Sequence, residues 1–126
     1  MTDTTAVDTA TLVDTYLDMW RAADDTTRRD RIAAVFTPEG RHVDPLADVS
    51  GHDGLAALLA NVHAQYPGFR IERTSGIDQY GNHARFTWRL DAADGAPIVS
   101  GLDIAELAAE GRIAEITSFW GDLPAR

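Results

Sequence analysis

The sequence predicts an α+β fold, in which helices from the first half of the chain pack against one face of a curved, mostly antiparallel sheet. Two observations predict it. Apolar residues recur at helical spacing up to Gly68, and after Gly68 they alternate in runs that turn residues separate. The 126 residues suffice for one domain with a sizeable core. We therefore expect a single domain over residues 1–126, with residues 1–6 frayed.

Two helices are expected before residue 40. The first starts near Val7, and its apolar stripe consists of Leu12, Val13, Tyr16, Leu17 and Trp20. The polar segment 24–30 (DDTTRRD) is expected to break it. Residues 29–36 (RDRIAAVF) then form a short second helix that ends near Thr37-Pro38, because a residue before proline disfavours the helical conformation.

A short strand and a third helix are expected next. Residues 40–45 (GRHVDP) form the strand, which stops at Pro45 because proline has no N–H for a strand ladder. Residues 48–68 form the helix, with Ser50 as its N-cap and Pro67-Gly68 at its end.

Four strands follow as a meander. They are expected at residues 69–78, 83–92, 98–107 and 112–120, each rich in β-branched and aromatic residues. The turns between the last three are centred on Gly95 and Gly111, and Tyr80-Gly81-Asn82 precedes the first of them. A curved sheet of this kind leaves a hollow between itself and the helices.

The composition excludes several kinds of chemistry and of partner. The net charge of -9 argues against nucleic acid and anionic membranes. The chain has neither cysteine nor lysine, which excludes disulfides, thiolate zinc sites, cysteine nucleophiles and lysine Schiff bases. None of the four serines lies in a G-x-S-x-G motif. Carboxylates, histidines and tyrosines therefore remain as the candidate groups for chemistry at a site.

The expected location is the cytoplasm. The first residues, MTDTTAVDTATLVDT, have neither the basic nor the apolar region of a signal peptide. No apolar run approaches the roughly 18 residues of a membrane span, so no membrane contact is expected.

The parity of each strand predicts which side chains face the hollow, because side chains alternate across a strand. In residues 83–92 the apolar face contains Phe86 and Trp88, and in the last strand Ser118 and Trp120 share a parity. In residues 98–107 one face carries a single acid, Asp103, among small or apolar residues. In the short strand, His42 and Asp44 share a face. These side chains are candidates for the wall of a pocket.

At this point the residues resemble a known superfamily. Two features resemble the nuclear transport factor 2-like (NTF2-like) superfamily. One is the order helix–helix–strand–helix–meander. The other is the pair of segments VDPLADVSGHDGL at 43–55 and GLDIAELAAEGRIAEITSFWG at 101–121. This group includes SnoaL-like polyketide cyclases, scytalone dehydratase, ketosteroid isomerase and small bacterial members of unknown function. The resemblance implies a cystatin-like α+β cone that encloses a pocket for a small hydrophobic molecule, and a homodimer that pairs through the open sheet face.

Ketosteroid isomerases are similar in particular residues. Their general base is an aspartate before proline, which Asp44 resembles, and their oxyanion tyrosine resembles Tyr16. Their neutral aspartic acid lies eight residues before the glycine of a GRI-like turn, as Asp103 lies before Gly111. Their aromatic wall at the end of the last strand corresponds to Trp120. The tyrosines that support the oxyanion tyrosine in some isomerases are replaced here by Phe36 and Leu59.

Our leading hypothesis is therefore a cofactor-independent acid–base enzyme, of isomerase, cyclase or dehydratase type, that acts on a small and mostly apolar carbonyl or phenolic substrate. Asp44 would be the base, His42 would assist it, and Tyr16 and Asp103 would donate hydrogen bonds to the oxyanion. Expected ligand contacts are Trp20, His63, Phe86, Trp88, Ser118 and Trp120. His63 is included because scytalone dehydratase uses histidines together with an aspartate.

Other interpretations remain open. The chain is alternatively a non-catalytic protein that binds a hydrophobic metabolite, or an association domain with a vestigial pocket. A limonene-type epoxide hydrolase is disfavoured, because Gly101 stands where those enzymes carry an arginine. His42, Asp44 and His63 lack a tight ligand spacing, so no metal site is expected.

Overall fold

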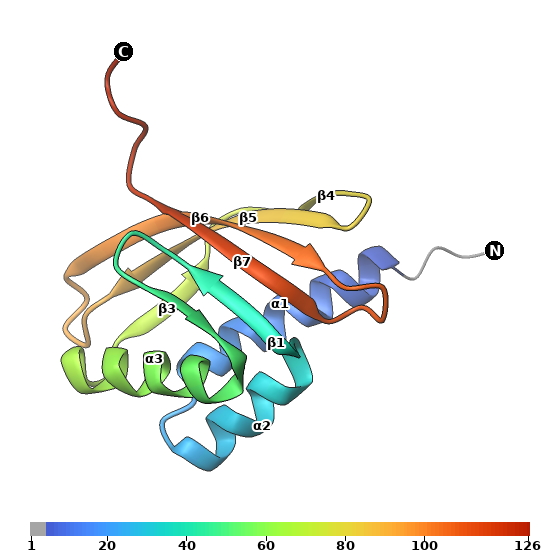
Figure 1. Cartoon of the computed structure of the whole chain (residues 1–126). Helices are drawn as coiled ribbons and strands as arrows, with labels where there is room; N and C mark the ends of the chain where they lie inside the picture. Colours follow the sequence, from blue (N-terminus) through green and yellow to red (C-terminus); the bar gives the residue numbers. More distant parts are fainter. Residues whose placement is uncertain (1–4) are drawn as a thin grey trace.

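In the computed structural model, which describes residues 5–126, three helices lie on one side of a curved, open sheet of seven strands (Figure 1). The helices are α1 (Thr5–Arg21), α2 (Asp25–Val35) and α3 (Gly51–Gln65). The strands are β1 (Phe36–Val43), β2 (Asp48–Ser50), β3 (Arg70–Arg73), β4 (Asp78–Tyr80), β5 (His83–Asp91), β6 (Pro97–Leu107) and β7 (Ile113–Trp120). The predicted α+β cone is confirmed.

The sheet is mixed. Its strand order is β2-β1-β7-β6-β5-β3, and β4 also pairs with β5. The pair β1–β7 is parallel, and the other strand pairs of the described chain are antiparallel. The predicted parity of β5 is also confirmed, because Phe86 and Trp88 are buried while Arg85 and Arg89 are exposed. The apolar face of the central strands therefore meets the helices.

The predicted stripe of α1 provides much of the helical side of the core. Val13, Tyr16 and Leu17 are at most 2% exposed, and Trp20 is also buried. Burying a side chain of this kind contributes about 1.5 to 3 kcal/mol. The helix begins at Thr5, and residues 1–4, most of the segment expected to be frayed, lie outside the described residues.

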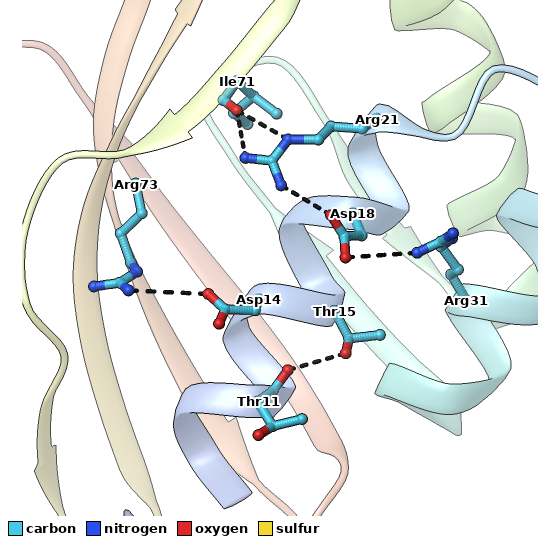
Figure 2. Close-up of polar contacts among 8 residues, drawn as sticks. All are labelled: Thr11, Asp14, Thr15, Asp18, Arg21, Arg31, Ile71 and Arg73. Carbon is cyan, nitrogen blue, oxygen red and sulfur yellow. Dashed lines mark hydrogen bonds and ion pairs between the residues drawn. The ribbon is translucent and has the colours of Figure 1, made fainter. Parts of the chain in front are cut away.

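The other side of α1 is polar and ties this helix to its neighbours (Figure 2). Arg21 donates through Nε and Nη2 to the carbonyl oxygen of Ile71 in β3, and through Nη1 to Asp18 at 2.9 Å. Asp18 also lies 3.6 Å from a guanidinium nitrogen of Arg31 in α2. These contacts hold the edge of the sheet and α2 against α1.

The predicted start of the second helix and the predicted extent of the first strand are wrong. Helix α2 begins at Asp25, because Asp24 is an N-cap whose carboxylate accepts the backbone N–H of Thr27 at 3.0 Å. The segment read as a helix breaker is thus a helix start. Strand β1 begins at Phe36 and contains Pro38, which lies in an irregular stretch of the β1–β7 ladder where its missing N–H is tolerated.

Two further boundaries differ from the prediction. Asp48–Ser50 is not helical but forms strand β2 against β1, so α3 starts at Gly51. Ser50 occupies the N-cap position, although its side chain makes no capping hydrogen bond within the described part of the chain. The predicted strand 69–78 divides into β3 and β4, which pair with successive halves of β5. One run of strand-forming residues is therefore divided into two strands where the sheet bends.

The outward face of the sheet carries Leu102, Ile104 and the 57% exposed Phe119. Pairing of two copies through this face stays a prediction. No helix within the described residues is long and apolar enough to cross a membrane.

Candidate active site

A cavity of about 380 Å³ lies between the helices and the sheet. Its wall comes from α1, α3, the turn after β1, and strands β1, β3, β5, β6 and β7. Its buried end holds polar side chains, and its open end is edged by exposed residues. Asp103, His42 and Tyr16 lie at the buried end and are at most 3% exposed, whereas Leu46 at the rim is 84% exposed. A ligand would therefore meet the titratable groups at its inner end.

Asp103 is the centre of a buried hydrogen-bond network. The Tyr16 hydroxyl donates to Oδ2 at 2.8 Å, and the indole Nε1–H of Trp88 donates to Oδ1 at 2.8 Å. The tyrosine comes from α1, whereas the acid and the tryptophan lie on adjacent strands. A carboxylate has about four lone-pair positions, and these two bonds occupy one position on each oxygen of Asp103.

The pKa of Asp103 is raised above its ordinary value of 3.8. Burial is the largest cause, because the charged form loses its hydration. Hydrogen bonds from Ser118, Trp88 and Tyr16 act in the opposite direction, since they stabilise the carboxylate, but they do not outweigh burial. Burial is also the main reason that the pKa of Tyr16 is raised well above 10, and the nearby charge of Asp103 adds to the effect. Both groups are therefore displaced toward their protonated forms.

Asp44 has a different environment at the turn after β1. Its Oδ1 accepts the backbone N–H groups of Leu46 and Ala47, both at 2.8 Å, and its Oδ2 accepts from His42 Nε2 at 3.0 Å. The side chain is 6% exposed. The residue that was predicted from an Asp-Pro step is thus both a cavity group and the anchor of an Asx-turn.

The pKa of Asp44 is lowered below 3.8. Burial alone would raise it, but the hydrogen bonds from His42, Leu46 and Ala47 stabilise the carboxylate and together outweigh burial. The same cavity therefore holds one carboxyl group that is displaced toward the ionised form and one that is displaced toward the neutral form.

Several predicted ligand contacts also line this cavity. Trp20 forms part of the wall, and its ring meets the His42 ring edge-on with centroids 5.7 Å apart. Ser118 and Trp120 lie on β7, and the Trp120 indole donates to the Ser118 hydroxyl at 3.1 Å. Trp88 is the fourth predicted ligand contact that lines the cavity. All four acid–base candidates share the cavity with them.

Two predicted ligand contacts lie elsewhere among the described residues. His63 turns away and donates Nε2–H to the carbonyl oxygen of Trp20 at 2.7 Å, with its ring 4.6 Å from that of Phe69. Burial lowers its pKa, which favours the neutral ring. Phe86 is a core residue whose ring meets Tyr16 edge-on at 6.0 Å. His63 and Phe86 therefore lie outside the cavity wall, and each contacts a residue that belongs to it.

The sequence interpretation missed the face that α3 turns to the cavity. Leu58, Asn61, Val62 and Gln65 line it, and Tyr66 follows at the end of the helix. Their spacing of three and four residues is the signal that could have identified this face. Leu46, in the turn that Asp44 anchors, was missed as well.

No group of three or more His, Cys, Asp or Glu side chains in the described part of the chain is placed to hold a metal ion.

The chain is similar to known proteins over most of its length. The family model described as a SnoaL-like domain matches residues 13–116. A proposed isomerase of the SnoaL-like family from Agrobacterium tumefaciens is 33% identical, with a TM-score of 0.86 over 92% of this chain and 99% of that one. No curated protein sequence matches.

Two more distant structures are similar in fold. A protein of unknown function with a cystatin-like fold from Methylobium petroleophilum is 21% identical, with a TM-score of 0.76 over 94% of this chain and 79% of that one. A proposed SnoaL-like polyketide cyclase from Jannaschia sp. is 19% identical, with a TM-score of 0.73 over 90% of this chain and 85% of that one. These two support the cystatin-like cone alone.

Proposed function

Because the chain belongs to the SnoaL-like domain family, we propose that it is a cofactor-independent acid–base enzyme of isomerase, cyclase or dehydratase type. The substrate is a small, mostly apolar carbonyl or phenolic molecule. One observation carries the proposal: Asp44 and Asp103 line one cavity, and their environments displace their pKa values in opposite directions. Such a pair is the usual basis for dividing the roles of base and acid between two carboxyl groups.

Asp44 is the base in this proposal. Oδ1 already accepts two backbone N–H groups, whereas Oδ2 accepts one hydrogen bond from the described residues, that of His42, and keeps a lone pair. That lone pair removes a proton from the carbon next to the substrate carbonyl. A lowered pKa makes Asp44 a weak base, but it also keeps Asp44 ionised at neutral pH.

Asp103 and Tyr16 stabilise the enolate oxygen. With the acid proton on Oδ2, Asp103 donates to the Tyr16 oxygen, and the Tyr16 hydroxyl turns its own proton toward the ligand. This reverses the hydrogen bond of the structure, in which Tyr16 donates to Oδ2. The two oxygens are already in position inside the cavity, so only their protons turn, and the developing charge is stabilised without reorganising solvent.

Deuterium exchange tests the proposal without knowledge of the natural substrate. The bicyclic ketone 2-tetralone is incubated with the protein in D₂O, and loss of its C1 proton signals is followed by NMR. We expect the wild type to accelerate exchange, and Asp44→Asn to lose about 10²-fold or more of that rate. The asparagine oxygen still accepts the N–H groups of Leu46 and Ala47, so the turn is retained.

His83→Gln is the matched control, because His83 is exposed on β5 and outside the cavity wall. Exchange at the wild-type rate by Asp44→Asn would refute the base assignment. A wild type that binds 2-tetralone but exchanges no proton would refute enolisation.

A second candidate function is the binding of a small hydrophobic molecule without turnover. It is favoured by the three hydrogen bonds that already occupy Asp44, since a carboxylate held in a turn has a structural reason to exist. This function predicts ligand affinity that is unchanged in Asp44→Asn. We further propose that two copies pair through the outward sheet face, which the molar mass from light scattering tests.

A further inference from the structure

We propose that Trp88 is a positioning residue that acts through Asp103: its indole N–H occupies Oδ1, and the acid proton is thereby left to Oδ2, beside Tyr16. The inference rests on the proposed function, because it concerns the acid of that site. The supporting contact is buried, with Nε1 2.8 Å from Oδ1 and Trp88 7% exposed.

Gly101 makes this contact possible. Trp88 and Gly101 are directly opposite each other in the β5–β6 ladder, and Asp103 lies two residues further along the same face of β6. A Cβ atom at Gly101 would lie 2.6 Å from Cζ2 of Trp88, which is closer than Cβ atoms in proteins come to atoms to which they are not bonded. Because glycine has no side chain, the indole can lie across β6 and extend its N–H to the acid.

The direction of the proton follows from this bond. In a neutral carboxyl group the carbonyl oxygen is the better acceptor, and the hydroxyl oxygen is the donor. An indole donates only, so its N–H favours Oδ1 as the carbonyl oxygen. The hydroxyl is then Oδ2, which is the oxygen 2.8 Å from the Tyr16 hydroxyl. Trp88 thus orients the acid for a relay from Asp103 through Tyr16 to the ligand.

Trp120 provides an internal comparison. It also lines the cavity, but its indole N–H donates to the Ser118 hydroxyl at 3.1 Å instead of to Asp103. A variant of either tryptophan removes one indole from the same cavity, yet only the Trp88 variant loses a bond to the acid.

A carboxyl-carbon NMR titration of the unliganded protein tests the inference. In Trp88→Phe we expect the pKa of Asp103 to rise by about 1 to 2 relative to the wild type, because a hydrogen bond to the carboxylate is lost. In Trp120→Phe we expect less than about a third of that rise. Asp103→Asn assigns the signal.

A second readout needs no altered Trp88 and therefore holds even if Trp88→Phe does not fold. In the wild type, the Trp88 indole N–H resonance should move with the Asp103 titration, and further than the Trp120 resonance, because Trp120 reaches the acid only through the Ser118 hydroxyl. An unchanged Asp103 pKa in folded Trp88→Phe, or a Trp88 resonance that does not move, would overturn the role of Trp88 and leave the proposed function intact. An ordinary wild-type Asp103 pKa would instead remove the acid from the proposed function.

Discussion

Helix α1 has two polar environments on opposite sides, and they differ in what they do to the groups they hold. On the inner side, Tyr16 meets Asp103 in a buried network whose donors and acceptor are at most 7% exposed. On the outer side, Asp18 and Arg21 form an ion pair whose side chains are 48% and 44% exposed (Figure 2). The distances are nearly equal, at 2.8 and 2.9 Å.

The difference shows that distance alone does not determine what a polar contact contributes. Water solvates the outer groups whether or not they are paired, so the pair adds little. At the inner site, an unpaired group has no water to replace its partner, and the charged form of the acid is disfavoured. The inner network can therefore displace pKa values and support chemistry, whereas the outer pair lies within α1 and adds little to stability.

The largest effect that would test this difference is the loss of the buried acceptor. Asp103→Ala leaves the Tyr16 hydroxyl and the Trp88 indole without their partner, and should lower the free energy of unfolding by about 2 to 4 kcal/mol. Asp103→Asn keeps an acceptor oxygen and should cost less than about 1 kcal/mol. Urea unfolding measures both variants. Equal losses in the two variants would show that the inner hydrogen bonds matter no more than the volume of the side chain.

The next effect is a pH dependence of opposite sign for the two cavity acids. Asp103 has a raised pKa, so its contribution to stability is complete below its ordinary value of 3.8 and is lost as the pH rises through the raised value. Asp44 has a lowered pKa, so its contribution is present above 3.8 and is lost as the pH falls through the lowered value. A tenfold change in the acid dissociation constant on folding corresponds to about 1.4 kcal/mol of stability.

Urea unfolding from pH 3 to 8 measures this dependence. Relative to Asp103→Asn, the wild type should lose stability as the pH rises above about 4. Relative to Asp44→Asn, the wild type should gain stability as the pH rises toward about 4. Parallel curves for the two variants would mean that the cavity does not distinguish the two carboxyl groups.

The smallest effect is expected on the outer side of α1. Asp18→Asn should lower the free energy of unfolding by less than about 0.5 kcal/mol, and 1 M NaCl should remove most of the difference from the wild type. A loss above about 1 kcal/mol that persists in salt would place the outer pair in the same class as the buried network.

Much of the site could be predicted from the sequence because strand parity is a local property. The alternation in β5 and β6 correctly placed Trp88 and Asp103 on the inner face. The spacing of residues along a helix determines less clearly which side chains face a cavity. His63 lies one residue after the cavity-lining Val62, yet its side chain turns to a backbone carbonyl. Pro38 was misread because an irregular ladder tolerates a missing N–H, which no local pattern reveals.

The order of residues along the chain was sufficient to predict the α+β plan, the buried stripe of α1 and the inner faces of the long strands, because hydrophobic periodicity follows from the geometry of one element at a time. Tertiary packing was needed to bring Tyr16 to Asp103 across 87 residues, and to make Trp88 instead of Trp120 the donor to that acid. It was also needed to place the turn that Asp44 anchors beside the cavity. These contacts depend on how the sheet curves and on the space left over Gly101, and such distances arise only when all the elements are packed together.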